Sequence, residues 1–195
     1  STKAFSPNNR SMQLITPLKL ETGFTRSRNN NATLEALHAD GHSLAAVIGT
    51  RIVVLDVDVS TPERPDKQGD ESLTRLSADL GVDFSPFLTV VSPTGGQHYY
   101  FRRSEDLKFQ GLPREYPDID LLTGSRYVLI PPSPHWSGTG NYEFAPGFKG
   151  VIDHADSYLT QSDAAILRLP EVPSPFLSLI VRPPRTRATS NCQID

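Results

Sequence analysis

The stretch Ile52-Val53-Val54-Leu55-Asp56-Val57-Asp58 decides the fold that the sequence predicts. Its first four residues are continuously apolar, which is typical of a strand covered on both faces. Residues two apart on a strand point to the same face, so the side chains of Asp56 and Asp58 are expected to project together. The sequence therefore predicts a buried central strand that ends in a pair of carboxylates.

Further strands are predicted around this stretch, separated by turn signals. The expected strands cover residues 44–48, 52–55, 88–92, 98–101, 118–122 and 126–130. A Gly49-Thr50 turn separates the first two, Gly95 and Gly96 supply the positive φ of a first hairpin, and Thr123-Gly124-Ser125 closes a second. Hairpins of this kind predict a mostly antiparallel sheet.

Helices are predicted over residues 32–40, 70–80 and 162–169, with Asp70 as the cap of the second and Gly81 as its stop. Strand hairpins combined with these helices indicate an α+β fold. A length of 195 residues suits one globular domain. We expect an irregular entry over 1–31, a folded domain over 32–170 and a tail or linker over 171–195.

Composition excludes several classes of protein. No apolar stretch approaches the roughly 18 to 20 residues that a membrane-spanning helix needs, so no membrane association is expected. The single cysteine, Cys192, excludes a disulfide framework and a cysteine-rich zinc site, and a cytoplasmic location is the default expectation. A net charge of −3 excludes a protein that grips nucleic acid over its whole surface, so any DNA contact is expected to be local.

Paired aspartates point to metal chemistry. Two carboxylates held close together repel each other unless a cation lies between them, and their hard oxygens suit Mg²⁺ or Mn²⁺. A second pair, Asp118 and Asp120, opens the strand over 118–122, and we favour Asp120 as a third metal ligand and Asp118 as a cap or turn residue. Three carboxylates are what a two-metal phosphoryl-transfer site requires. The alternative is that the first pair is a solvated strand edge.

The hairpin turn between these acids has features of a phosphate site. Gly95 and Gly96 expose backbone N–H groups and allow a bulky anion to approach, and His98 follows at the head of a strand. A glycine turn alone indicates only a hairpin, and a histidine at a strand start is often structural. Because the turn lies between two acidic strand ends, both interpretations of His98 stay open.

The segment after the second hairpin can line a pocket. Proline stiffens the loop Pro131-Pro132-Ser133-Pro134-His135-Trp136, which carries a hydroxyl, an imidazole and an indole. In the alternative interpretation Trp136 covers the core and His135 is solvated. Arg126, at the start of the preceding strand, either meets triphosphate charge or pairs with an exposed acid.

The order of these motifs resembles a known family. The stretch 52–58, then Thr94-Gly95-Gly96-Gln97-His98-Tyr99-Tyr100-Phe101, then Ile119-Asp120 and Tyr127-Val128-Leu129-Ile130-Pro131-Pro132-Ser133 are similar to the bifunctional primase–polymerase (Prim-Pol) domain of the archaeo-eukaryotic primase superfamily. The resemblance runs from about Leu44 to Phe144. The chain resembles the phage, plasmid and prophage replication proteins in which this domain precedes a helicase.

The resemblance implies a fold, an activity and a set of site residues. The fold is an RRM-like sheet with flanking helices and a small α/β module, and the activity is DNA primase and DNA polymerase, with dNTPs or NTPs, a primer and a single-stranded DNA template as substrates. The implied catalytic and metal-binding residues are Asp56, Asp58 and Asp120, with two Mg²⁺ or Mn²⁺ ions, and His98 contacts phosphate. Arg126 and Ser133 fall in the stretch that lines the nucleotide pocket. A helicase domain or partner, a bacterial or archaeal host cell, and a phage, plasmid or prophage origin are also implied.

Two other functions compete with this interpretation. A metal-dependent nuclease of the rolling-circle type needs two histidines that flank one apolar residue, and His98-Tyr99-Tyr100 contains only one. A primase-like module without activity would bind nucleotide or nucleic acid as an accessory. Since all three acids are present, we favour the enzyme.

Overall fold

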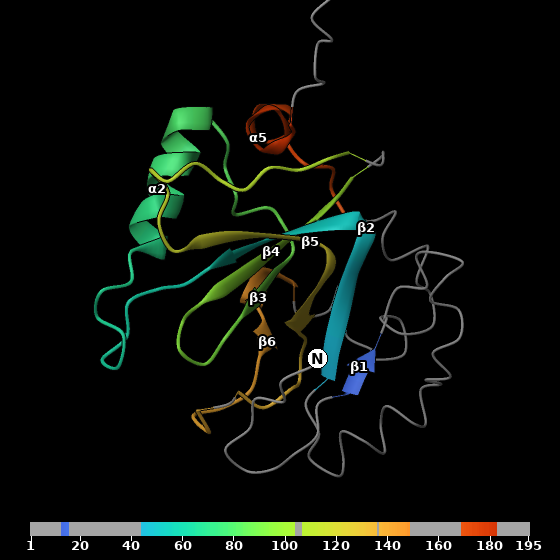
Figure 1. The fold of residues 1–195 in the computed structure, drawn as a ribbon. Helices are drawn as coiled ribbons and strands as arrows, with labels where there is room; N and C mark the ends of the chain where they lie inside the picture. Colours follow the sequence, from blue (N-terminus) through green and yellow to red (C-terminus); the bar gives the residue numbers. More distant parts are fainter. Residues whose placement is uncertain (1–12, 16–43, 104–106, 136, 149–168, 183–195) are drawn as a thin grey trace, which may run out of the picture.

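The computed structural model describes residues 13–15, 44–103, 107–135, 137–148 and 169–182. This part of the chain forms an α+β fold in which a six-stranded sheet packs against helices (Figure 1). The strands are β1 (Gln13–Ile15), β2 (Leu44–Val57), β3 (Thr89–Val91), β4 (Gln97–Arg102), β5 (Ile119–Leu129) and β6 (Glu143–Phe144). The helices are α2 (Gly69–Leu80) and α5 (Ser174–Ile180), and a 3₁₀ turn η1 covers Pro146–Phe148.

The long strand β2 organises the sheet. The strand order is β1-β2-β4-β3-β6, and β5 also pairs with β2. Only β1 runs parallel to its neighbour β2, whereas every other pairing between these strands is antiparallel. The predicted α+β class and mostly antiparallel sheet are therefore confirmed.

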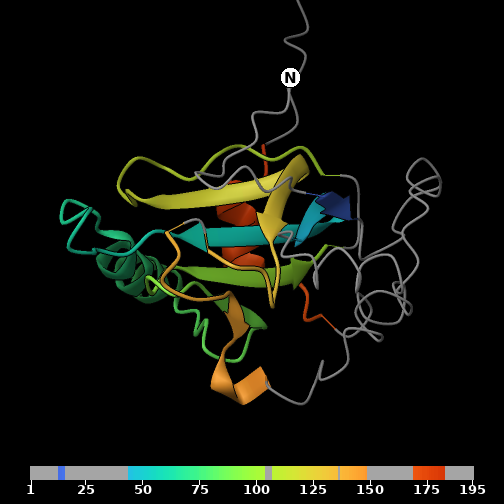
Figure 2. The same cartoon turned by 90° about the horizontal axis from the view of Figure 1, so that it is seen from below.

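Successive residues of β2 point to opposite faces of the sheet and so build two cores. Val53, Leu55 and Val57 pack in one core with Leu76 of α2 and Phe176 of α5, and we call this side the helix face. The other core contains Ile52 and Val54 with, among others, Tyr100, Leu122 and Tyr142, and we call this side the site face. Figure 1 shows α2 and α5 together above the sheet with β6 below it, and in Figure 2, from below, α5 lies behind the strands.

Two predicted turns are instead bends inside continuous strands. Gly49, expected to separate two strands, lies within the 14-residue β2, and Gly124, expected to close a hairpin, lies within the 11-residue β5. The two glycines are register partners with φ of 69° and 65°, and the register shifts on either side of Gly49. An irregularity of this kind needs the same positive φ as a tight turn, so the two give the same signal in the sequence. The expectation of a second hairpin was wrong, since Gly124 lies inside one continuous strand.

Helix α2 ends at the predicted residue, but it begins at a different cap from the predicted one. Its C-terminus is as expected, because Gly81 adopts a left-handed conformation and its N–H bonds the carbonyl of Ala78. Its N-cap, however, is Gln68 and not Asp70, which lies in the first turn. The side chain of Gln68 makes no capping bond, but its backbone N–H is held from far away in the sequence, since the carboxylate of Asp118 accepts it at 3.1 Å. Asp70 as the cap was therefore wrong.

The chain after residue 170 contributes to the core. Helix α5 buries Phe176 and Ile180 completely, and residues 170–172 bond to Arg102 of β4 through backbone groups. This corrects the expectation that the tail begins at 171. Strand β1 likewise lies inside the segment expected to be an irregular entry. The predicted helix over 32–40, almost all of the one over 162–169, and Trp136 lie outside the described residues.

Candidate active site on the site face

The centre of the candidate site is a row of three side chains across the sheet. His98 of β4 and Asp120 of β5 are the direct register partners of Asp56, one on each side of β2. Directly opposed residues in antiparallel strands point to the same face, with Cβ atoms about 4.5 to 5.5 Å apart. The row lies on the site face, just beyond the apolar residues Ile52 and Val54. It stands at the end of β2, where the strand leaves the core.

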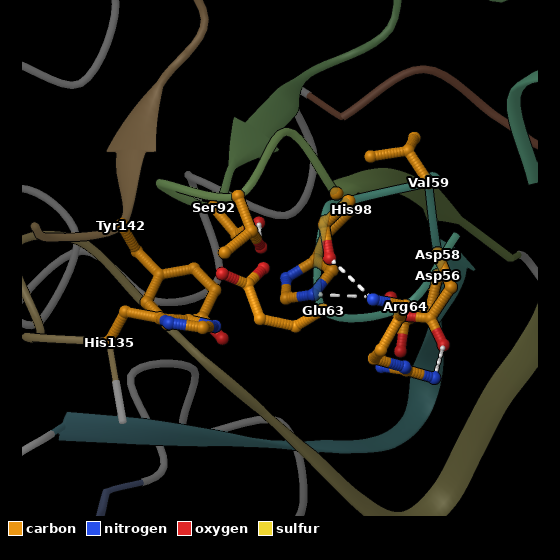
Figure 3. Close-up of a pocket in the computed structure, with 12 residues that line it drawn as sticks. Asp56, Asp58, Val59, Glu63, Arg64, Ser92, His98, His135 and Tyr142 are labelled. Carbon is orange, nitrogen blue, oxygen red and sulfur yellow. Dashed lines mark hydrogen bonds and ion pairs between the residues drawn. The ribbon is translucent and has the colours of Figure 1, made fainter. Parts of the chain in front are cut away.

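A cavity of about 350 Å³ opens beside this row. Its lining comes from the end of β2 and the loop after it, the β3–β4 turn, and the segment before β6. The lining residues are Asp56, Asp58, Val59, Thr61, Glu63, Arg64, Ser92, Thr94, Gly96, His98, His135 and Tyr142. In Figure 3, His98 lies between two groups of side chains, with Asp56, Asp58 and Arg64 on one side and Tyr142 and His135 on the other.

His98 is oriented by a carboxylate and an aromatic ring. Its Nε2 lies 3.3 Å from Oδ1 of Asp56, and the side chains of His98 and Asp56 are 11% and 32% exposed. Tyr142 stacks on the imidazole with 5.7 Å between ring centroids and 27° between ring planes. Nδ1 of His98 is buried and has no hydrogen-bond partner among the described residues. Nε2 is therefore the nitrogen with which His98 can act on a ligand.

The aromatic wall of the cavity stays uncharged near neutral pH. Burial, followed by the nearby negative charges of Asp56 and Asp58, raises the pKa of the Tyr142 hydroxyl to about 12. Burial lowers the pKa of His135, whose Nδ1 lies 2.6 Å from Oγ of Ser137. His135 contacts the other side of the wall, with its ring centroid 5.5 Å from that of Tyr142. These two rings thus give the cavity an uncharged aromatic wall.

Asp58, just beyond the end of β2, is held by two cationic side chains. Its Oδ2 lies 3.1 Å from Nη2 of Arg64 and 3.0 Å from Nζ of Lys67. Nζ of Lys67 also lies 2.5 Å from Oδ1 of Asp118. Lys67 thus bridges the two acidic segments, whereas Arg64 lines the cavity itself.

Asp118 has the structural role that its sequence position predicts. Its φ of 59° is that of a turn residue, and its carboxylate accepts hydrogen bonds from Lys67 and from the Gln68 N–H. The hydrogen bond that Lys67 donates to Asp118 lowers the pKa of Asp118 and raises the pKa of Lys67. Its carbonyl accepts the N–H of Asp58 at 2.9 Å. Asp118 therefore anchors the loop that carries Asp58 and the start of α2.

The β3–β4 turn brings backbone close to the acids. Gly95 has a φ of 91°, and the turn is closed by the Ser92 N–H on the Gly96 carbonyl at 2.8 Å. A Cβ on Gly96 would lie 3.1 Å from Oγ of Ser92 and 3.3 Å from the carbonyl of Val57. Only Gly95 of the two glycines has a positive φ. Gly96 instead packs closely against Ser92 and Val57, and it lines the cavity together with Ser92 and Thr94.

Comparison with protein families identifies the chain. A family model described as "Bifunctional DNA primase/polymerase, N-terminal" (Prim-Pol) matches residues 10–162. The chain belongs to the Prim-Pol family. The match extends on both sides of residues 44–144, which carried the resemblance in the sequence. No curated protein and no solved structure matches this chain.

Most of the predicted site residues of this Prim-Pol domain lie at one place. Asp56, Asp58, Gly96, His98 and His135 line the cavity, with Gly95 in the adjoining turn. Asp120 is exposed and lies next to Asp56 in register, outside the cavity lining.

Two predicted residues lie elsewhere. The cavity lining does not include Arg126, which is exposed on β5, or Ser133, which is fully buried. Ser133 instead supports the aromatic wall, because its carbonyl accepts the Tyr142 N–H at 2.8 Å. For these two residues the predicted contact with nucleotide has no support in the geometry.

Sequence reasoning missed four residues of this site. Glu63, Arg64 and Lys67 lie in a charged loop that contains no recognisable motif, and Tyr142 belongs to no motif either. The loop offered one signal, since its acidic and basic residues directly follow the aspartate pair and cannot reach far from it. Tyr142 offered none, because it meets His98 only through the pairing of β3 with β4 and β6.

The carboxylates of the Prim-Pol site have the right chemistry for divalent cations, but they do not converge on one point. Within the described ranges, no group of three or more His, Cys, Asp or Glu side chains is gathered closely enough to hold a metal ion. The Asp58 carboxylate points toward Arg64 and Lys67, and these two side chains supply the positive charge next to it.

No helix in the described part of the chain has the length and apolar character that crossing a membrane requires.

Proposed function

We propose that this Prim-Pol domain catalyses template-directed nucleotidyl transfer, adding dNTPs or NTPs to a 3′-hydroxyl on single-stranded DNA. The observation that carries the proposal is the row of His98, Asp56 and Asp120 beside a cavity bordered by the β3–β4 turn. Carboxylates next to an imidazole and backbone N–H groups suit a substrate that combines phosphate with divalent cations. Membership of a primase–polymerase family supports the same class of reaction.

In this proposal Asp56, Asp58 and Asp120 hold two Mg²⁺ or Mn²⁺ ions. Carboxylate oxygens are the ligands that these ions prefer, and Asp56 and Asp120 are adjacent in register. Asp58 already attracts two cationic groups, and it joins the site by turning from them toward Asp56. The bound ions would activate the attacking hydroxyl and neutralise the leaving diphosphate.

The other side chains bind and orient the nucleotide. The Nε2–H of His98 donates to a phosphate oxygen once the Asp56 carboxylate turns to a cation, and Tyr142 keeps the imidazole plane in place. The Gly96 backbone and the hydroxyls of Ser92 and Thr94 border the same space. The neutral wall of Tyr142 and His135 adds no negative charge to a site that must accept a polyanion.

Primer extension tests this proposal directly. We expect wild-type protein with Mg²⁺ or Mn²⁺ to extend a labelled primer on single-stranded template, and the Asp56→Ala, Asp58→Ala double variant to give no product. The matched control is Asp66→Ala, Asp70→Ala, which removes two exposed carboxylates outside the cavity lining and should retain activity.

Absence of product from folded wild-type protein that still binds triphosphate would contradict the proposal and favour a nucleotide-binding accessory module. Unprimed template with labelled nucleotides then separates a primase from a polymerase that only extends. A product that forms equally well in the double variant would also contradict the assignment of these acids.

A further inference from the structure

The loop between β2 and α2 presents a second set of charges to the cavity. Thr61 and Arg64 exchange backbone hydrogen bonds of 3.2 and 3.0 Å, and Oγ1 of Thr61 accepts the Arg64 N–H at 3.1 Å. These bonds close a tight turn that holds Arg64 at the cavity edge. The position of Arg64 is therefore set by its own backbone and not only by its ion pair.

Arg64 and Lys67 both contact Asp58, but they differ in what else holds them. Lys67 is 18% exposed and also pairs with Asp118, so it keeps a partner if Asp58 moves. Arg64 is 49% exposed, and within the described ranges its only ion pair is the one with Asp58. An exposed ion pair of this kind is weak and easily exchanged. Arg64 is thus the cation that is released when Asp58 takes another partner.

Phosphate oxygens bound in the cavity would offer the released guanidinium a new partner. Arg64 lines the same cavity as Gly96, Ser92 and His98, where the proposed function puts the phosphates of the incoming nucleotide. Guanidinium groups bind phosphate oxygens with two parallel hydrogen bonds, which a lysine ammonium does not reproduce. Figure 3 shows Arg64 and Asp58 on the same side of His98, and both residues line the cavity.

We propose that Arg64 is a triphosphate-binding residue that exchanges partners: it holds Asp58 in the empty site and moves to the nucleotide phosphates when divalent cations occupy Asp58. This inference rests on the proposed function and adds to it a residue that selects the triphosphate. Lys67 stays on Asp118 throughout and positions the loop. Arg64 thereby couples metal binding to recognition of the phosphate chain.

Binding measurements without template test this exchange apart from activity. Isothermal titration of dATP and of dAMP into the protein with Mn²⁺ gives two affinities for each variant. For Arg64→Ala we expect about tenfold weaker binding of dATP, with dAMP binding changed less than about twofold, because the charge-assisted contact that is lost is with phosphates that dAMP lacks. Arg64→Lys should recover only part of the loss. The control Arg114→Ala removes an exposed arginine outside the cavity lining and should change neither affinity.

Four outcomes would overturn the inference. Equal losses for dATP and dAMP would mean that Arg64 supports the fold of the site and not the phosphates. Unchanged dATP affinity together with tighter Mn²⁺ binding would mean that Arg64 only competes with the metal for Asp58. If wild-type protein extends primers while Arg64→Ala keeps full dATP affinity, the inference fails and the proposed function stands, whereas wild-type protein that binds no triphosphate contradicts both.

Discussion

Both faces of β2 are apolar along much of the strand, but they end in different kinds of side chain. On the helix face, Val53, Leu55 and Val57 are buried under α2 and α5. On the site face, the apolar residues Ile52 and Val54 lead to Asp56, which is 32% exposed. One face therefore stabilises the domain, and the other ends in a group that is available for chemistry.

This difference shows how a stable strand can hold repelling charges together. The carboxylates of Asp56 and Asp120 lie side by side only because the register of β2 with β5 is fixed, and that register is held largely by burial of the alternate residues. We therefore expect substitutions in the buried helix face to lower stability and substitutions of the acids at the end of the site face to lower activity. The following predictions test that separation, beginning with the largest effect.

Loss of an aromatic ring from the helix face should have the largest effect. Phe176 of α5 is fully buried and contacts the rings of Phe84 and Phe101. Replacing Phe176 with Ala removes these contacts and leaves a cavity, so the free energy of unfolding should fall by about 3 to 5 kcal/mol. Urea denaturation measures this change in the free energy of unfolding. Tyr127→Ala, at an exposed site on β5, is the control and should change it by less than about 0.5 kcal/mol. An unchanged midpoint for Phe176→Ala would mean that α5 is a tail after all.

Two aspartates at the start of β5 should separate activity from stability. Asp120→Asn should lower primer extension by at least about 100-fold with little change in stability, since even substitutions behind a metal ligand commonly cost 10- to 100-fold. Asp118→Asn should lower the free energy of unfolding by about 1 kcal/mol through its bonds to Lys67 and Gln68, and retain activity within about tenfold. Rates and urea midpoints of both variants decide the matter. The reverse pattern would exchange the roles of these two residues.

The start of α2 is where the two faces are coupled. A Cβ on Gly69 would lie 2.3 Å from the carbonyl oxygen of Asp58 and 2.8 Å from that of Asp118. Because both are backbone atoms that cannot move aside cheaply, Gly69→Ala should cost about 1 to 3 kcal/mol and also displace Asp58. We expect both stability and primer extension to fall. Gly81→Ala, strained by its φ of 61° but open around its Cβ, is the control and should affect stability alone.

The smallest effect is a pH dependence on the helix-face side. Burial, then the hydrogen bond of 2.9 Å to Asp79, raises the pKa of Tyr116. In the unfolded chain the Tyr116 hydroxyl ionises at a pH of about 10. The stability due to Tyr116 is therefore complete below that pH and is lost as the pH rises through the folded-state pKa. Tyr116→Phe should therefore be less stable than wild type by about 1 kcal/mol or less at pH 7, and the gap should narrow in alkali. If the urea midpoints of wild type and Tyr116→Phe differ by the same amount at pH 7 and in alkali, this prediction is contradicted.

The elements that could be predicted are those with a local signal. The apolar run of β2, the β3–β4 hairpin with its glycine turn, and the end of α2 at Gly81 follow from neighbouring residues. The elements that were mistaken depend on a distant partner. Gly49 and Gly124 each carry the signal of a turn, and only their pairing across two strands makes them a bend. The seven residues of α5 are too few to indicate a helix unless the core covers them.

The candidate site divides in the same way. Asp56, Asp58, Asp120 and His98 were found because carboxylate pairs and a glycine turn leave a pattern in the sequence. Arg64, Lys67 and Tyr142 were missed because a charged loop and a lone tyrosine have no such pattern. Lys67 and Asp118 are 51 positions apart, and no sequence pattern in either segment indicates their contact. The same limit explains why Arg126 and Ser133, close to the motifs in sequence, lie outside the cavity.

The sequence by itself determined the α+β class, the buried central strand and the residue types that suit phosphate and metal chemistry. These follow from the period of apolar residues and from side-chain chemistry, which act over a few neighbouring positions. Only the tertiary structure decided that His98, Asp56 and Asp120 form one row, that α5 belongs to the core and that Arg64 faces the cavity. The physical reason is that strand register and burial depend on contacts between segments far apart in the chain, where apolar area and hydrogen bonds are satisfied together.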